Sequence, residues 1–89
     1  MNELANNLKL LREDRKYTKK EIAELIGTTW HSYKNWENGR YIPTLQSLIN
    51  LCKVYNVSLD ELVGLKKIKE SNLINKDVFV ENTENEETK

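Results

Sequence analysis

Apolar residues recur at helical spacing through the first two thirds of the chain, and turn-forming residues separate the repeats. The pattern predicts five short helices, over about residues 2–15, 18–26, 30–38, 44–55 and 58–63. Gly27, Gly39 and Gly64 are the only glycines, and each falls at a predicted helix end, where the left-handed conformation closes a helix. The only proline, Pro43, stands just before the fourth helix. Because these turn residues and the periodicity agree, we expect an all-α fold.

Hydroxyl side chains mark the starts of three predicted helices. The pairs Thr18–Glu21 and Ser58–Glu61 have capping-box spacing, in which each side chain bonds the backbone N–H of its partner. Thr29 is the expected cap of the third helix. In the fourth helix the periodicity predicts a single inward face. Its expected members are Leu45, Leu48, Cys52 and Tyr55.

Residues 18–40 are predicted to form one short helix, a glycine-centred turn and a second short helix. Two helices joined so closely cannot pack side by side as an ordinary antiparallel hairpin, so they must cross steeply. The crossing leaves the second helix protruding from the domain. This is helix-turn-helix geometry, in which the second helix enters a DNA groove.

The formal net charge is zero, which is unusual for a protein that binds nucleic acid. The charges are unevenly distributed, however. Residues 9–20 hold six basic side chains against two acidic ones, whereas residues 81–89 hold four glutamates against one lysine. Positive charge is therefore concentrated near the predicted helix-turn-helix. The alternative interpretation is a solvated helix face followed by a solubilising tail.

Several classes of protein are disfavoured by the residues present. Cys52 is the only cysteine, which excludes an intrachain disulfide and a metal site built on repeated cysteines. No apolar run is long enough to cross a bilayer, and the first residues lack the features of a signal peptide, so we expect a cytoplasmic protein. His31, the only histidine, and Cys52 lie on different predicted helices, so we expect no catalytic pair, no enzyme and no cofactor.

Residues 4–65 resemble the Cro/C1-type (XRE-family) helix-turn-helix domain of phage repressors and bacterial regulators. The residues that carry the resemblance are Thr18, Glu21, Ala23, Gly27, Trp36-Glu37-Asn38-Gly39, Pro43 and Val57-Ser58-Leu59-Asp60-Glu61-Leu62. The resemblance implies a compact five-helix, lambda-repressor-like DNA-binding domain. It also implies an ion pair between Arg12 and Glu37, which would tie the first helix to the end of the third.

The resemblance further implies which side chains contact double-stranded DNA. With Tyr33 and Trp36 facing the core, helical geometry turns the opposite face of the third helix outward. The expected base contacts are Trp30, His31, Lys34 and Asn35. The expected phosphate contacts are Lys16, Lys19, Thr29, Ser32, Asn38, Arg40 and Tyr41. Trp30 departs from the small or polar residue that most relatives carry, so packing on Leu25 or binding to a protein is the alternative role.

A single recognition helix reads only a few base pairs, and relatives solve this by pairing through the region of the fourth and fifth helices. The resemblance therefore implies a homodimer on a palindromic operator. The expected interface consists of Tyr55, Asn56, Val57, Leu59 and the segment around Phe79.

After residue 65 the composition changes to Lys, Asn and Glu, with an apolar island at residues 73–74 and 78–80. This change divides the chain into a domain over residues 1–65 and a tail over residues 66–89. We expect the tail to be partly disordered or to contribute to a dimer interface, since residues 77–80 have strand-like composition.

The function that these features favour is transcriptional repression by sequence-specific binding to double-stranded DNA. Two alternatives stay open. The first is the antitoxin of a toxin–antitoxin pair, in which the tail from Lys66 onward folds on a toxin. The second is a helix-turn-helix scaffold used for protein–protein interaction, with Trp30 as its anchor. None of the three involves a membrane.

Overall fold

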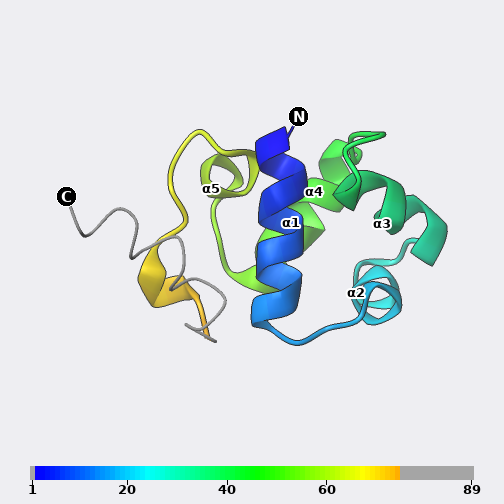
Figure 1. Ribbon diagram of the computed structural model, residues 1–89, viewed down its shortest axis with the longest axis horizontal. Helices are drawn as coiled ribbons and strands as arrows, with labels where there is room; N and C mark the ends of the chain where they lie inside the picture. The colour runs from blue at the N-terminus through cyan, green and yellow to red at the C-terminus, as the bar shows by residue number, and fades with distance from the viewer. Residues whose placement is uncertain (1, 75–89) are drawn as a thin grey trace.

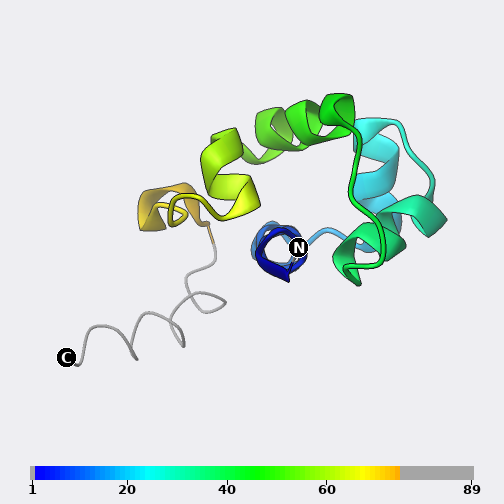
Figure 2. The same cartoon turned by 90° about the horizontal axis from the view of Figure 1, so that it is seen from above.

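The computed structural model describes residues 2–74 as five α-helices and one 3₁₀ turn. The elements are α1 (Asn2–Asp14), α2 (Lys19–Ile26), α3 (Trp30–Glu37), α4 (Leu45–Tyr55), α5 (Leu59–Val63) and η1 (Glu70–Asn72). The helix at the centre is α1, with α2 and α3 on one side and α5 on the other (Figure 1). Seen along α1, the other four helices form an arc around it (Figure 2). The predicted all-α, five-helix architecture is confirmed.

One apolar core joins all five helices. From α1, Leu8 and Leu11 are completely buried, and they pack together with Ile22 of α2, Leu51 of α4 and Leu62 of α5. Burying an aliphatic side chain of this size contributes roughly 1.5–3 kcal/mol. The central position of α1 follows from this pattern, because its apolar residues share one core with residues of every other helix.

The predicted helix ends are confirmed by their hydrogen bonds. Thr18 Oγ1 accepts from the backbone N–H of Glu21 at 3.0 Å, and Glu21 Oε1 accepts from the N–H of Thr18 at 2.8 Å. Ser58 and Glu61 form the second capping box with the same two distances. Gly27 closes α2 with φ of 79°, a left-handed conformation that favours glycine.

The predicted inward face of α4 is partly wrong. Leu45 is 63% exposed, whereas Leu51, which was not on the expected face, is completely buried. Leu48 and Cys52 are partly buried against the core. Leu45 is the first residue of α4 and lies before the turns that pack on α2 and α5. The core therefore begins at Leu48, and the periodicity extended it one turn too far.

Two residues expected at a dimer interface are instead in the core of the single chain. Tyr55 is completely buried and Val57 is 7% exposed. Arg15 Nη2 donates to the carbonyl of Tyr55 at 2.7 Å, which ties the end of α4 to α1. These two side chains are enclosed by their own domain, so they have no surface to offer a second copy. Asn56 and Leu59 remain accessible.

Packing continues beyond residue 65, where the composition changes. Ile68 and Leu73 are buried and belong to the core. Glu61 Oε2 accepts from the backbone N–H of Lys69 at 3.0 Å, and Asp14 Oδ2 accepts from that of Ile74 at 2.7 Å. Residues 66–74 thus fold along the domain. Residues 75–89, with the predicted contact at Phe79, lie outside the described residues.

Candidate nucleic-acid interface

The link between α2 and α3 is as tight as the sequence predicts. Thr28 N–H bonds the carbonyl of Ala23 at 2.9 Å, and α3 begins two residues later, at Trp30. Ala23 is 1% exposed, so its small side chain lies on the buried side of α2, within the core. In Figure 1, α2 is viewed nearly end-on while α3 runs across the page, which shows the steep crossing. The second helix of the pair is thereby left at the edge of the molecule.

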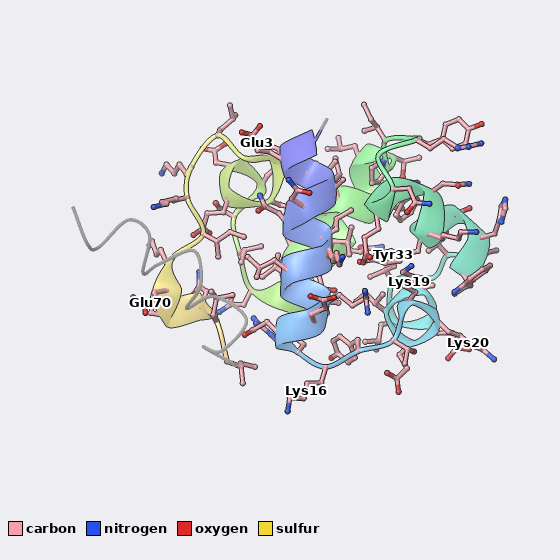
Figure 3. All side chains as sticks on the ribbon, viewed as in Figure 1. Glu3, Lys16, Lys19, Lys20, Tyr33 and Glu70 are labelled. Carbon is pink, nitrogen blue, oxygen red and sulfur yellow. The ribbon has the colours of Figure 1, made fainter. Side chains whose placement is uncertain are left out.

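One face of α3 is fixed to the core by aromatic side chains. Tyr33 is completely buried and Trp36 is 8% exposed, and their rings meet edge to face with centroids 6.1 Å apart. Figure 3 shows Tyr33 on the inward side of α3, whereas Lys16 and Lys20 extend away from the domain. Burial raises the pKa of the Tyr33 phenol far above its ordinary value, so the hydroxyl stays protonated. It donates to Glu37 Oε2 at 2.7 Å.

The ion pair implied by the resemblance is present and is almost completely enclosed. Arg12 Nε bonds Glu37 Oε2 at 2.7 Å, and Nη2 bonds Oε1 at 3.2 Å. The side chains are 13% and 3% exposed respectively. The hydrogen bond to Glu37 raises the pKa of the Arg12 guanidinium. Because Arg12 Nη1 also donates to the carbonyl of Tyr17 at 2.9 Å, this one side chain joins α1, the start of the α2 segment and the end of α3.

The opposite face of α3 is open to solvent. Trp30 is 47% exposed, His31 is exposed, and Lys34 and Asn35 are partly exposed. Lys34 Nζ lies 5.1 Å from the centroid of the Trp30 ring, within the range of a cation–π contact. The structure thus brings the four predicted base contacts together on one accessible surface, which we call the recognition face.

The predicted phosphate contacts flank the recognition face on both sides in the chain. Lys16 and Lys19 precede it, and Asn38, Arg40 and Tyr41 follow it, and all five are at least partly exposed. The remaining two, Thr29 and Ser32, lie at its first turn. Their hydroxyls are already in use: Thr29 Oγ1 accepts from the N–H of Ser32 and donates to its Oγ, both at 3.1 Å. These two residues cap α3, so any phosphate contact would have to share their hydroxyls.

The hydroxyl of Tyr33 is a part of the site that sequence reasoning missed. The aromatic ring was expected in the core, but the bond from its hydroxyl to Glu37 was not. A signal for it exists, because Tyr33 and Glu37 are four residues apart and so lie on the same side of a helix. The bond means that Glu37 is held from two directions, by α1 and by its own helix.

A helix-turn-helix family model matches residues 8–62, which is more than half of the chain. The chain belongs to the Cro/C1-type helix-turn-helix family. Members of this family are DNA-binding transcriptional regulators and not enzymes. The steeply crossed α2 and α3, with an inner face fixed and an outer face free, agree with that assignment.

Among curated proteins, this Cro/C1-type chain is similar to the transcriptional regulator ImmR of Bacillus subtilis, at 35% identity over 84% of this chain and 61% of that protein. It is also similar to the transcriptional repressor RstR of the cryptic phage CTXphi in Vibrio cholerae, at 34% identity over 68% of this chain and 51% of that one. A crystal structure of a transcriptional regulator from Listeria innocua matches with a TM-score of 0.67 and 28% identity, over 75% of this chain and 64% of that one.

The Cro/C1-type chain spans between about half and three fifths of the length of these two curated relatives. Within residues 2–74, none of its helices combines the length and apolar character that crossing a membrane requires. The same described residues contain no group of three or more His, Cys, Asp or Glu that could hold a metal ion.

Proposed function

We propose that this protein represses transcription by binding a palindromic DNA operator as a homodimer. The observation that carries the proposal is the division of α3 into two faces. Its inner face is held in the core by Tyr33, Trp36 and Glu37, while the recognition face is open to solvent. A helix anchored on one side and open on the other is suited to entering the major groove.

The side chains of the recognition face have the chemistry for reading bases. Asn35 can bond an adenine through two hydrogen bonds, and His31 can donate to guanine or accept from an amino group. Each good base contact of this kind contributes about 1–3 kcal/mol of discrimination against a wrong base. The N–H of Arg40 bonds the backbone carbonyl of Asn35 at 2.9 Å, so this bond does not occupy the Asn35 side chain.

Phosphate contacts would hold the domain in register on the duplex. The first four N–H groups of a helix have no partner inside the helix, and the capping box of α2 satisfies two of them. Those of Lys19 and Lys20 can donate to a phosphate oxygen, with the Lys19 ammonium beside them. Because only a few lysine and arginine side chains would contact phosphates, affinity for random DNA is expected to be modest, and its dependence on salt shallow, since the slope scales with the number of phosphates neutralised.

The surface for a second copy must lie outside the core, which removes Tyr55 and Val57. Leu59 is 39% exposed on α5, and Leu45 and Ile49 are 63% and 36% exposed on α4. Leu45 and Ile49 are four residues apart and so lie on the same side of the helix. Residues 41–52 contain no charged side chain, which suits an interface in which identical residues face each other. Pairing of this kind would set two α3 helices about 34 Å apart on DNA.

Selection of bound sequences from random duplex DNA tests the function. We expect one imperfect palindrome to be enriched at low salt, and the Lys34→Ala/Asn35→Ala double variant to lose the enrichment. Solution mass, measured with and without the selected duplex, tests the dimer. Failure to enrich any palindrome would refute the repressor function, and a monomer on and off DNA at high micromolar concentration would refute the dimer.

A second candidate function, antitoxin, is favoured by a relative. The antitoxin PezA of Streptococcus pneumoniae is 29% identical over 73% of this chain and 41% of that protein. In this function the same DNA-binding domain would be followed by a segment that binds a toxin. Growth of bacteria that express a neighbouring reading frame, with and without this protein, separates the two functions. The antitoxin function requires that the protein relieve growth arrest, whereas a repressor alone leaves growth unchanged.

A further inference from the structure

Trp30 is the one side chain of the recognition face whose surface is mainly apolar. We propose that its indole is a binding site for the 5-methyl group of pyrimidines in the major groove. The protein then distinguishes thymine from uracil, and accepts 5-methylcytosine better than cytosine, at one position in each half of its operator. This assignment rests on the proposed function, because it requires α3 to lie in the major groove.

The chemistry of the side chain limits what it can recognise. An indole offers one N–H donor and no acceptor, so it lacks the donor and acceptor pair that reads adenine or the double donor that reads guanine. The apolar feature that the major groove presents is the 5-methyl group of thymine. The same group on cytosine lies at the same place on the base. Trp30 is the first residue of α3 and 47% exposed, so a large apolar surface stands where the helix meets DNA.

One contact within α3 restrains the indole before any ligand arrives. Lys34, one turn further along, holds its ammonium 5.1 Å from the ring centroid. The backbone at Trp30 is fixed by the cap, in which Thr29 Oγ1 accepts the N–H of Ser32 at 3.1 Å. Side chains that are already ordered lose less entropy on binding. With one face of the ring occupied by a cation, the opposite face is left for an apolar contact.

The first experiment changes single methyl groups in the selected operator. Each thymine is replaced in turn by deoxyuridine, in both half-sites together, and affinity is measured by fluorescence anisotropy. We expect one position at which the loss is about fourfold per half-site, or about 15-fold for the dimer, the effect of one buried methyl group. At that position a C·G pair should bind weakly, and 5-methylation of its cytosine should restore about the same factor.

Protein variants test whether the preference for the methylated base depends on the indole of Trp30. In Trp30→Ala and Trp30→Gln the ratio of affinities for thymine and uracil duplexes should fall to about one. Because Trp30 is exposed, both variants are expected to keep the helical circular dichroism of the parent protein. Leu25→Ala is the matched control: it removes another exposed apolar side chain, 55% accessible on α2, and should leave the ratio unchanged.

Three results would overturn the assignment, and they are distinguishable. If removal of the methyl group changed affinity at no thymine, Trp30 would not bind a methyl group, and it would instead stack between bases or bind a protein. A thymine preference that persists in Trp30→Ala would place the methyl contact on another residue. Failure to enrich any operator would refute the proposed function itself, and this assignment with it.

Discussion

The two faces of α3 differ in how their side chains are held. On the inner face, Tyr33 and Glu37 are buried and bonded to each other, and Glu37 is bonded again to Arg12 of α1. On the recognition face, the one side-chain contact observed is between Lys34 and Trp30, within the helix itself. The eight residues of α3 therefore separate two tasks. One side fixes the position of the helix, and the other can change without cost to the fold.

The largest expected effect is that of Glu37→Ala, which removes the buried carboxylate from the inner face of α3. The substitution leaves the enclosed guanidinium of Arg12 with the carbonyl of Tyr17 at 2.9 Å and the half-exposed carboxylate of Glu13 at 3.9 Å. Removal of one partner from a buried ion pair costs about 3–5 kcal/mol, a large share of the 5–15 kcal/mol typical of a whole domain. Urea denaturation measures the loss.

Glu24→Ala is the control for this variant, since Glu24 is an exposed residue inside α2. It should change the free energy of unfolding by no more than about 0.5 kcal/mol. If Glu37→Ala cost as little as that, the pair would have to be open to water, and the inner face would not be what positions α3.

Tyr33→Phe is a smaller change on the same inner face of α3. The ring stays in the core, and the hydroxyl is lost, with its bond to Glu37 at 2.7 Å and its longer contact with the carbonyl of Leu8 at 3.4 Å. Hydrogen bonds to charged groups contribute about 1.5–3 kcal/mol, so the free energy of unfolding should fall by an amount in that range. Tyr41→Phe, which alters a phenol that is 61% exposed, should have no measurable effect in the same urea titration. Equal effects of the two substitutions would contradict a role for the buried hydroxyl.

Glu61 is a second buried carboxylate, outside α3, and backbone N–H groups bond it where a guanidinium bonds Glu37. The backbone N–H groups of Ser58 and Lys69 bond Glu61 at 2.8 and 3.0 Å, and the bond from Ser58 is the main reason that its pKa is lowered from 4.5. A carboxylate whose folded pKa is below its unfolded value stabilises the fold fully above the unfolded pKa. That stabilisation disappears as the pH falls through the folded pKa.

We therefore expect the midpoint of urea unfolding to be level above about pH 5 and to fall below about pH 4.5. Glu61→Gln keeps the shape but cannot gain this proton, so it should be less stable at neutral pH and show a shallower fall. An identical pH dependence in the two proteins would assign the acid sensitivity to other carboxylates.

The sequence predicts the inner face of α3 well because the signals for it are local. Capping boxes, glycines at helix ends and the spacing of Tyr33 and Trp36 depend only on residues a few positions apart. The ion pair of Arg12 and Glu37 spans 25 positions. No local pattern predicts it, and it came from the family resemblance alone.

Features that depend on where one helix packs against another were harder to predict. The periodicity of α4 places Leu45 and Leu51 equally well on an apolar face, and only the positions of α2 and α5 decide which is covered. Tyr55 and Val57 were assigned to a second copy, yet their own chain encloses them. The packing of Ile68 was missed for a related reason, because a segment rich in Lys, Asn and Glu gives little sign that one of its residues is buried.

Asn35→Ala tests the other side of the comparison and should have the smallest effect on stability. Its side chain is partly exposed, and the bonds that Arg40 and Tyr41 make to residue 35 go to the backbone carbonyl, which the substitution keeps. The free energy of unfolding should change by no more than about 0.5 kcal/mol, while discrimination between the selected operator and a scrambled duplex falls by about 1–3 kcal/mol. Urea titration and competition binding, measured on one preparation, give the two numbers. A loss of stability as large as that of Tyr33→Phe, or unchanged discrimination, would mean that the two faces of α3 are not separate.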